Sequence, residues 1–262
     1  MSNTAILPYV SKVLEEQDAY RRAGPSVLPR AVRSVTAPIG ALASGLIPSE
    51  VVEAAIKGAD WVAAASVRAK VLAHDFEVLE DCDQAAVEVR NWALGLAVTS
   101  GGAAGAFGAA GLAFDIPATM TLALRTARLT GLAYGFGGEG AEEQVYILDI
   151  LQLAAANSED ERAEAVQRLA DGRVRLGRED WQKIAEMSGQ SAGAAAATQR
   201  VAATLGVYLS ARKLAQVAPV LGAAIGASVN GAFQTDVARA AQFAFRARWL
   251  ELNERLIEGE AL

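Results

Sequence analysis

The sequence contains one cysteine, Cys82, and one histidine, His74. No disulfide can therefore form within the chain, and the paired Cys/His spacing of a zinc site is missing. Asp and Glu outnumber Lys and Arg, giving a formal net charge of −6, which does not favour binding to nucleic-acid phosphates. No phosphate-binding glycine-lysine-serine/threonine run and no dinucleotide-binding glycine pattern after a strand is found. We therefore expect no metal, no cofactor and no nucleic-acid partner.

Aromatic residues are also scarce, at 6%, and no segment alternates apolar and polar residues as a strand does. Apolar residues nevertheless make up 52% of the chain, mainly as alanine and leucine, and the mean hydropathy is positive at +0.22. Alanine is the best helix former, whereas strands prefer β-branched and aromatic residues. The sequence predicts an all-α fold, a multi-helix bundle around two Gly/Ala-rich apolar helical hairpins.

A secretory signal is not recognised at the N-terminus, because no basic region followed by an apolar run precedes Lys12 and Glu15. We expect a location in the cytoplasm or at the inner face of the cytoplasmic membrane. Four prolines, at positions 25, 29, 38 and 48, predict a broken connector after a first helix over 5–22. The predicted organisation is an N-terminal helix with a proline-rich connector (1–48) and a helical domain (49–257).

Further helices are predicted over 49–72, from about 84, over 118–134 and 141–156, from about 180 to 212, and over 235–257. The start of a short charged helix is indicated by Ser158 and Glu161, which have the spacing of a capping box, and this helix is expected to be solvated. The sequence Asp115-Ile116-Pro117 is expected to interrupt a helix, with Asp115 as the cap of the next one. The acidic stretch from Asp75 to Asp83 is interpreted as a solvated helix start.

Two long segments, 91–114 and 214–235, carry no charged residue and are rich in glycine. Glycine inside a helix costs about 1 kcal/mol relative to alanine, so its repetition needs a reason. Small residues four apart allow two helix backbones to approach closely. Glycines with this function are expected at Gly101, Gly105, Gly108, Gly222 and Gly226.

Two interpretations of these segments remain open. They are hairpins that enter or touch a membrane, or they are buried central helices of a soluble bundle. The last helix presents the same choice, because it carries three aromatic residues among several arginines. The aromatic residues are Phe243, Phe245 and Trp249. Such a helix can lie at a membrane interface or pack its aromatic residues on the core.

Three stretches of the sequence resemble the EcsC family of bacterial proteins over roughly residues 50–250. They are Asp115-Ile116-Pro117 with the following arginine helix, the turn from Ala133 to Phe136, and the run from Pro219 through Asn230 to the last helix. The resemblance implies an α-helical, membrane-associated accessory role, without an established activity, substrate or cofactor. Family-like positions are Asp115, Arg125, Tyr134, Gly135, Asn230 and Arg246.

Polar residues in apolar surroundings are the remaining candidates for function. Asp115 is expected either to cap or pair with Arg125 or Arg128, or to act as a functional carboxylate. Asn230 is expected to fix helix register through its amide. The run from Gly189 to Gly193 matches a hydrolase nucleophile motif around Ser191, but no strand precedes it and no histidine follows it. His74 and its acidic neighbours lack metal-site spacing.

The leading hypothesis is a non-catalytic, membrane-associated helical protein, an accessory to a transport or envelope process. Its partners would then be membrane lipid or a membrane protein complex. The alternative is a soluble bundle that binds a lipid or another hydrophobic ligand. A hydrolase is the remote third hypothesis.

Overall fold

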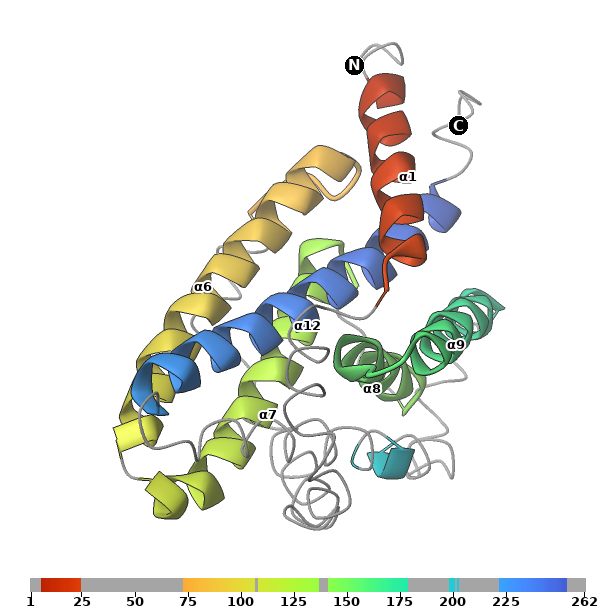
Figure 1. Ribbon diagram of the computed structural model, residues 1–262. Coiled ribbons are helices and arrows are strands. Elements are labelled where there is room, and N and C mark those ends of the chain that lie inside the picture. Colours follow the sequence, from red (N-terminus) through yellow and green to blue (C-terminus); the bar gives the residue numbers. More distant parts are fainter. Residues whose placement is uncertain are drawn as a thin grey trace.

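The computed structural model describes residues 6–24, 73–106, 108–136, 141–178, 198–200, 202 and 222–253. Inside the helices, the side chains of residues 6–7, 98–106, 108–117, 141, 175, 177–178 and 222–229 are not among those described. Across these ranges the secondary structure is helical and contains no strand, which confirms the all-α prediction. The main helices (Figure 1) are α1 (Ile6–Arg22), α6 (Leu79–Ala106), α7 (Gly108–Ala133), α8 (Ala141–Ala155), α9 (Glu159–Arg178) and α12 (Gly222–Leu252).

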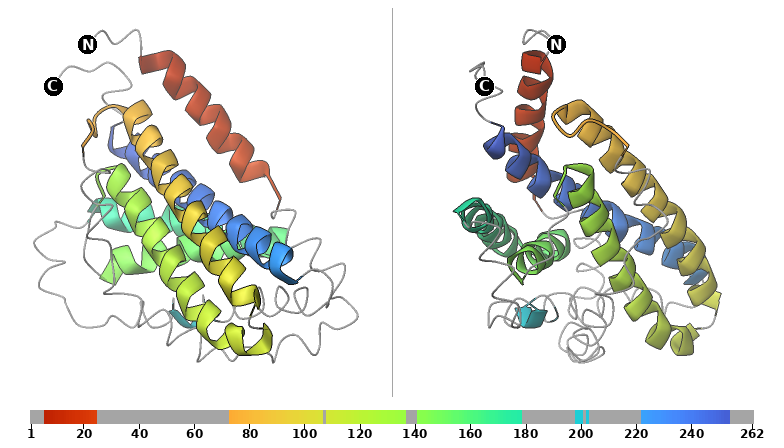
Figure 2. Two further views of the ribbon diagram at one scale, coloured as in Figure 1. Left: turned by 90° about the vertical axis from the view of Figure 1, so that its left-hand side faces the viewer. Right: turned by 180° about the vertical axis from the view of Figure 1, so that it is seen from behind.

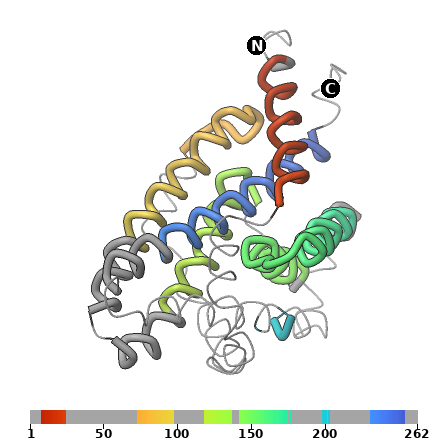
Figure 3. Tube along the Cα trace, viewed as in Figure 1, coloured from red at the N-terminus to blue at the C-terminus, as the bar shows by residue number. Residues whose placement is uncertain are grey.

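Three long helices, α6, α7 and α12, pack against one another at the centre of the molecule (Figure 1). Only Phe107 separates α6 from α7, and the two helices run in opposite directions (Figure 1). Helix α12 runs in the same direction as α7. Near its middle, Gln234 bonds to Thr119 and Thr126, and farther along, Phe245 lies against Gly131. The course of the three helices can be followed in Figure 3.

Helices α8 and α9 form a second layer on α12, and α1 lies on the outside near the C-terminal half of α12 (Figure 2). From Val145 onward, helix α8 is apolar apart from Asp149 and Gln152, and a helix with apolar residues on all sides must be buried. Residues 145–155 of α8 are all buried. They join the largest core side chains, which are Tyr134, Tyr146, Phe233, Phe245, Met120, Leu129, Ile150, Leu151, Leu153 and Leu169.

The capping box at the start of α9 is present. The backbone N–H of Glu161 donates to Ser158 Oγ at 3.1 Å, and the Glu161 carboxylate accepts from the N–H of Asn157 at 2.7 Å. Both bonds satisfy donors that a helix start leaves without partners. The helix is not simply solvated as expected, because Ala165 and Leu169 on one face are fully buried.

The predicted break at residues 115–117 is wrong. Helix α7 begins at Gly108 and continues through Asp115, Ile116 and Pro117, so Asp115 does not cap a helix start. A proline in a helix interior removes one backbone hydrogen bond, and packing on α6 and α12 offsets that loss. The charge-free segment 91–114 is consequently divided between the end of α6 and the start of α7.

The last helix begins earlier than predicted, at Gly222, and ends at Leu252. Its aromatic residues Phe243, Phe245 and Trp249 are at most 3% exposed, so the core interpretation of this helix is confirmed and the interfacial one is wrong. Within the described ranges, no helix combines the length and the hydropathy needed to cross a bilayer. The helices predicted over 49–72 and 180–212 lie outside the described residues, apart from 198–200 and 202, which are helical.

Candidate functional site

A buried carboxylate, Asp83, lies at the centre of the most connected polar cluster of the described residues. It is the fifth residue of α6 and is 4% exposed. Asp83 shares the inner face of α6 with Leu79, Cys82 and Ala86, which are also buried. The expectation of a solvated acidic stretch holds for Asp75, Glu77 and Glu80, which are exposed, but is wrong for Asp83.

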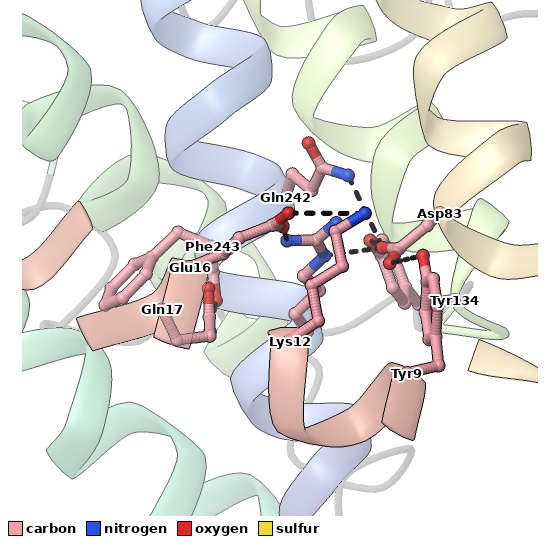
Figure 4. Close-up of polar contacts among 9 residues, drawn as sticks. Tyr9, Lys12, Glu16, Gln17, Asp83, Tyr134, Gln242 and Phe243 are labelled. Atoms are coloured by element: carbon pink, nitrogen blue, oxygen red, sulfur yellow. Dashed lines mark hydrogen bonds and ion pairs between the residues drawn. The ribbon is translucent and has the colours of Figure 1, made fainter. Parts of the chain in front are cut away.

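Four side chains from three other segments donate hydrogen bonds to Asp83 (Figure 4). Tyr9 on α1 donates to Oδ2 at 2.7 Å, and Tyr134 at the end of α7 donates to Oδ1. From α12, Arg246 Nε lies 2.5 Å and Gln242 Nε2 lies 3.4 Å from Oδ1. A buried charge is costly unless it is paired and hydrogen-bonded, and these donors meet both conditions.

Arg246 continues this network to the surface. Its Nη1 lies 2.7 Å from Glu16 on α1, whose carboxylate is half-exposed. Burial alone would lower the pKa of the Arg246 guanidinium, but the hydrogen bond to Asp83 and the nearby negative groups outweigh it, so its pKa is raised. Arg246 is thus a fixed cation between two carboxylates of different elements.

Both tyrosines of the cluster keep their protons. Burial, followed by the charge of Asp83, raises the pKa of Tyr134 well above its usual range. Burial and the hydrogen bond to Asp83 likewise raise the pKa of Tyr9. The neighbouring Cys82 thiol has its pKa raised to about 12 by burial and by the charge of Asp83, so it is not a nucleophile at neutral pH. Both oxygens of the Asp83 carboxylate accept hydrogen bonds, and the donors come from α1, α12 and the end of α7. The cluster therefore joins these helices to α6.

The position of Tyr134 follows from the turn that ends α7. The N–H of Phe136 donates to the carbonyl of Gly131 at 2.8 Å, and the N–H of Gly135 donates to that of Leu132 at 3.0 Å. This pair of bonds is the Schellman motif, which requires a left-handed residue after the cap. Gly135 fills that position with φ of 80°. The motif therefore fixes Tyr134 as the cap residue whose hydroxyl reaches Asp83.

A second buried ion pair lies beyond this turn. Arg248 Nη1 on α12 lies 2.9 Å from both carboxylate oxygens of Glu143 on α8, and both residues are about 5% exposed. The Arg248 guanidinium also lies 4.2 Å from the ring centroid of Phe136. Burial raises the pKa of Glu143, and the charge of Arg248 opposes that shift without cancelling it. The pair connects α12 with α8.

Among the polar candidates from the sequence, Tyr134 and Arg246 are brought together by the structure, because both bind Asp83. Asn230 is buried on α12, and Arg128 on α7 is close enough to Glu143 to lower its pKa. The guanidinium of Arg125 lies 5.2 Å from the ring centroid of Trp92, and its buried Nε has no hydrogen-bond partner among the described residues. The side chain of Asp115 lies outside the described ones, so its pairing stays a prediction.

Asp83, Tyr9, Gln242 and Glu16 were missed by the sequence interpretation. For Asp83 a signal existed, because it follows Leu79 by four residues and precedes Ala86 by three. This spacing places the carboxylate on the apolar side of a helix. Tyr9 and Glu16 carried no comparable signal, since their partners lie 74 and 230 residues away in the sequence.

The five predicted packing glycines lie on α6, α7 and α12. Their surroundings lie outside the described side chains, so their packing function stays a prediction. A different glycine shows the same physical principle. A Cβ atom at Gly131 would lie 2.7 Å from Cζ of Phe245 and 3.0 Å from the carbonyl oxygen of Phe136. The absence of a side chain at Gly131 therefore lets α7 approach α12.

Two further sequence features are the acidic cluster around His74 and the run from Gly189 to Gly193. No group of three His, Cys, Asp or Glu side chains in the described ranges could hold a metal ion. His74 Nε2 instead lies 2.8 Å from the carbonyl oxygen of Ala133. The nucleophile-like run from Gly189 to Gly193 lies outside the described residues.

Comparison with known proteins gives a family but no close relative of known activity. The sequence model of the EcsC protein family matches residues 22–250, which is most of the chain. No curated protein and no solved structure matches it.

Proposed function

We propose a function for this chain, which belongs to the EcsC protein family: it is a non-catalytic helical protein that associates with a membrane surface through the uncharged end of its central helices. The lipid would be that of the inner face of the cytoplasmic membrane. In this role the protein assists a membrane complex of transport or envelope function.

The observation that carries the proposal is the distribution of charge along α6, α7 and α12. Residues 91–106 of α6, 108–114 of α7 and 222–235 of α12 have no charged side chain. The antiparallel course of α6 and α7, and the common direction of α7 and α12, assign these stretches to one end of the three-helix centre. We call it the uncharged end. The buried ion pairs lie away from this end, because Asp83 is near the start of α6, and Arg246 and Arg248 are near the end of α12.

Asp115 limits how deeply this end can enter lipid. Seven residues separate Phe107 from Asp115, and at 1.5 Å per residue they extend about 10 Å along the helix axis. Interfacial helices bury their apolar surface about 5–10 Å into the boundary between head groups and acyl chains. The proposal is therefore shallow insertion of a helix end into one leaflet.

Trp92 and Arg125 lie where the uncharged end meets the charged part of these helices. Trp92 is the second residue of the uncharged stretch of α6, and Arg125 is the first cation of α7 after that end. Their side chains pair by a cation–π contact and both are partly exposed. At 1.5 Å per residue they lie about 22 Å and about 27 Å from Phe107 along their helices, so this pair stays outside the shallowly inserted part.

The test is flotation of the full chain with phospholipid vesicles, with and without an anionic lipid. The variant Phe107→Glu places a charge between α6 and α7, and Leu252→Glu makes the same kind of change at a 61% exposed residue at the far end of α12. The wild-type protein and Leu252→Glu should float with the vesicles. Phe107→Glu should lose binding about tenfold or more, which corresponds to about 1.4 kcal/mol.

Circular dichroism spectra of the three proteins establish whether each one is folded. A wild-type protein that stays at the bottom of the gradient with both lipid mixtures refutes the proposal. Equal loss of binding in both variants refutes the assignment of the uncharged end as the contact.

A further inference from the structure

We propose that the surface under α1 is a helix-docking groove and that α1 is its exchangeable occupant. The groove is the surface formed by Asp83, Phe243, Arg246 and Arg162, which all contact α1. An amphipathic helix of a partner protein, with a hydroxyl donor and a carboxylate two turns apart, would bind there in place of α1. This inference does not depend on membrane association.

The first argument is the boundary of the family match. The match begins at residue 22, at the end of α1, whereas the residues of the groove lie inside it. The groove thus belongs to the part of the chain that defines the family, and its present occupant comes from outside that part.

The second argument is that α1 contacts the rest of the protein through one narrow stripe. The contacting residues Tyr9, Val10, Val13, Glu16, Gln17 and Tyr20 follow one another at the spacing of a single helix face. The opposite face is exposed, and includes Lys12, Glu15 and a leucine, Leu14, that is 52% exposed. Among the described side chains of α1, Val10 and Val13 are the buried apolar ones. The helix therefore docks as a separate amphipathic ligand does.

The third argument is that the Asp83 carboxylate of the groove stays hydrogen-bonded without α1. Asp83 keeps the hydrogen bonds from Tyr134, Gln242 and Arg246. Besides the Phe243 carbonyl and the two Arg162 nitrogens that bond to backbone at the end of α1, its loss would free Oδ2 of Asp83 and Nη1 of Arg246, which now face Tyr9 and Glu16 (Figure 4). A preformed donor and a preformed acceptor would then be available to another helix.

These two atoms define the chemistry of the partner. Tyr9 and Glu16 are seven residues apart, so the partner helix needs a hydroxyl donor followed two turns later by a carboxylate. The apolar residues between them would occupy the place of Val10 and Val13. Gln17 adds a hydrogen bond of 2.8 Å to the carbonyl oxygen of Phe243, and Tyr20 lies 4.8 Å from the Phe243 ring.

Arg162 at the start of α9 fixes the direction of the docked helix. Its guanidinium donates to the carbonyl oxygens of Tyr20 at 2.7 Å and of Ala23 at 2.8 Å, and lies 4.4 Å from the Tyr20 ring centroid. The last carbonyls of a helix have no partner within it and carry partial negative charge, so a cation there is favourable. Arg162 consequently binds the backbone carbonyls at the C-terminal end of the docked helix, and this contact does not depend on the side chains of that helix.

The test uses the full chain and a fluorescent peptide that corresponds to residues 5–24. In the double variant Tyr9→Phe/Glu16→Gln, the chain's own α1 loses two contacts while the groove is unchanged. Binding of the wild-type peptide, measured by fluorescence anisotropy, should be at least tenfold tighter to this variant than to the wild-type chain. The expected range is roughly 10- to 100-fold, because each lost bond joins a charged group.

The matched control is Glu15→Gln, which makes the same chemical change on the exposed face of α1. This variant should bind the peptide as weakly as the wild-type chain. A peptide that itself carries Tyr9→Phe and Glu16→Gln should bind the double variant at least tenfold more weakly than the wild-type peptide does. Absence of peptide binding to the double variant overturns the proposal.

Hydrogen exchange provides the second measurement on the same variants. Amides of α1 should exchange at least tenfold faster in the double variant, with those of α6 and α12 unchanged. If α6 and α12 accelerate to the same extent as α1, the first helix is an inseparable part of the core, and the docking groove is refuted.

Discussion

Asp83 is a buried carboxylate on a helix face whose other residues are apolar, and its four donors come from segments that are distant in the sequence. Replacing this carboxylate therefore affects the ends of several helices at once. Removal of one partner from a buried ion pair also leaves the other charge without its buried partner, and here Arg246 would keep only the half-exposed Glu16.

The variant Asp83→Asn should consequently lower the free energy of unfolding by about 3–5 kcal/mol. Urea denaturation followed by circular dichroism measures this difference. Asp81→Asn is the matched control two residues earlier on the same helix, where the side chain is only partly buried. It should cost less than about 1 kcal/mol, since it loses a favourable charge near the helix start. Similar losses in the two variants would contradict the central place given to Asp83.

At the scale of the elements, glycine decides how closely α7 and α12 pack. Alanine is the better helix residue, so Gly→Ala in a helix is stabilising by about 1 kcal/mol unless the added methyl group meets another atom. Gly95 on α6 is exposed, and a methyl group added there would meet nothing within 4 Å. Gly131 on α7 faces Phe245, which is 1% exposed and cannot move freely.

The two substitutions should therefore have opposite signs. Gly131→Ala should destabilise the protein by about 1–3 kcal/mol because it overpacks the contact with Phe245. Gly95→Ala should stabilise it by up to about 1 kcal/mol. Thermal and urea unfolding of the two variants measure both values, and stabilisation by Gly131→Ala would show that the helices can separate without cost.

Elements with local signals were predicted well. The first helix, the helix over 141–156 and the cap at Ser158 depend on residues a few positions apart, and the structure confirms them. The break at Pro117 was predicted wrongly, because its outcome depends on packing against α6 and α12. Local sequence rules assign a free-energy cost to a proline in a helix interior, but they do not include the tertiary contacts that offset this cost.

The candidate site was predicted only in part, for the same physical reason. Tyr134 and Arg246 were chosen as separate residues, and nothing in either segment indicated that both would bind one carboxylate. The acidic run that contains Asp83 suggested solvent exposure by composition. Its burial follows from the turn of α6 that faces α7 and α12, and this contact is set by the assembled bundle.

For the whole molecule, the tyrosines determine how stability responds to alkaline pH. The chain has five tyrosines, and burial raises the pKa of Tyr9, Tyr20, Tyr134 and Tyr146 above the ordinary value of 10.0. The folded protein therefore retains phenol protons that the unfolded chain releases. Their contribution to stability is complete below the unfolded pKa of about 10 and is lost as the pH rises through the folded values.

At about pH 11 the native protein should accordingly show less than half of the tyrosinate absorbance of the urea-unfolded chain. The urea midpoint should fall steeply as the pH rises above about 10. In Tyr134→Phe this fall should be shallower, since one buried hydroxyl has been removed. Identical absorbance titrations of native and unfolded protein would contradict the burial of these four side chains.

The contacts of α1 also have a consequence for the order in which the protein is made. This helix leaves the ribosome before its partners Phe243 and Arg246, which are 226 and 230 residues farther along the chain than the residues they contact. Contacts between residues so distant in sequence form late, after the intervening chain has been synthesised. The newly made α1 thus stays without its binding surface until Phe243 and Arg246 have been synthesised.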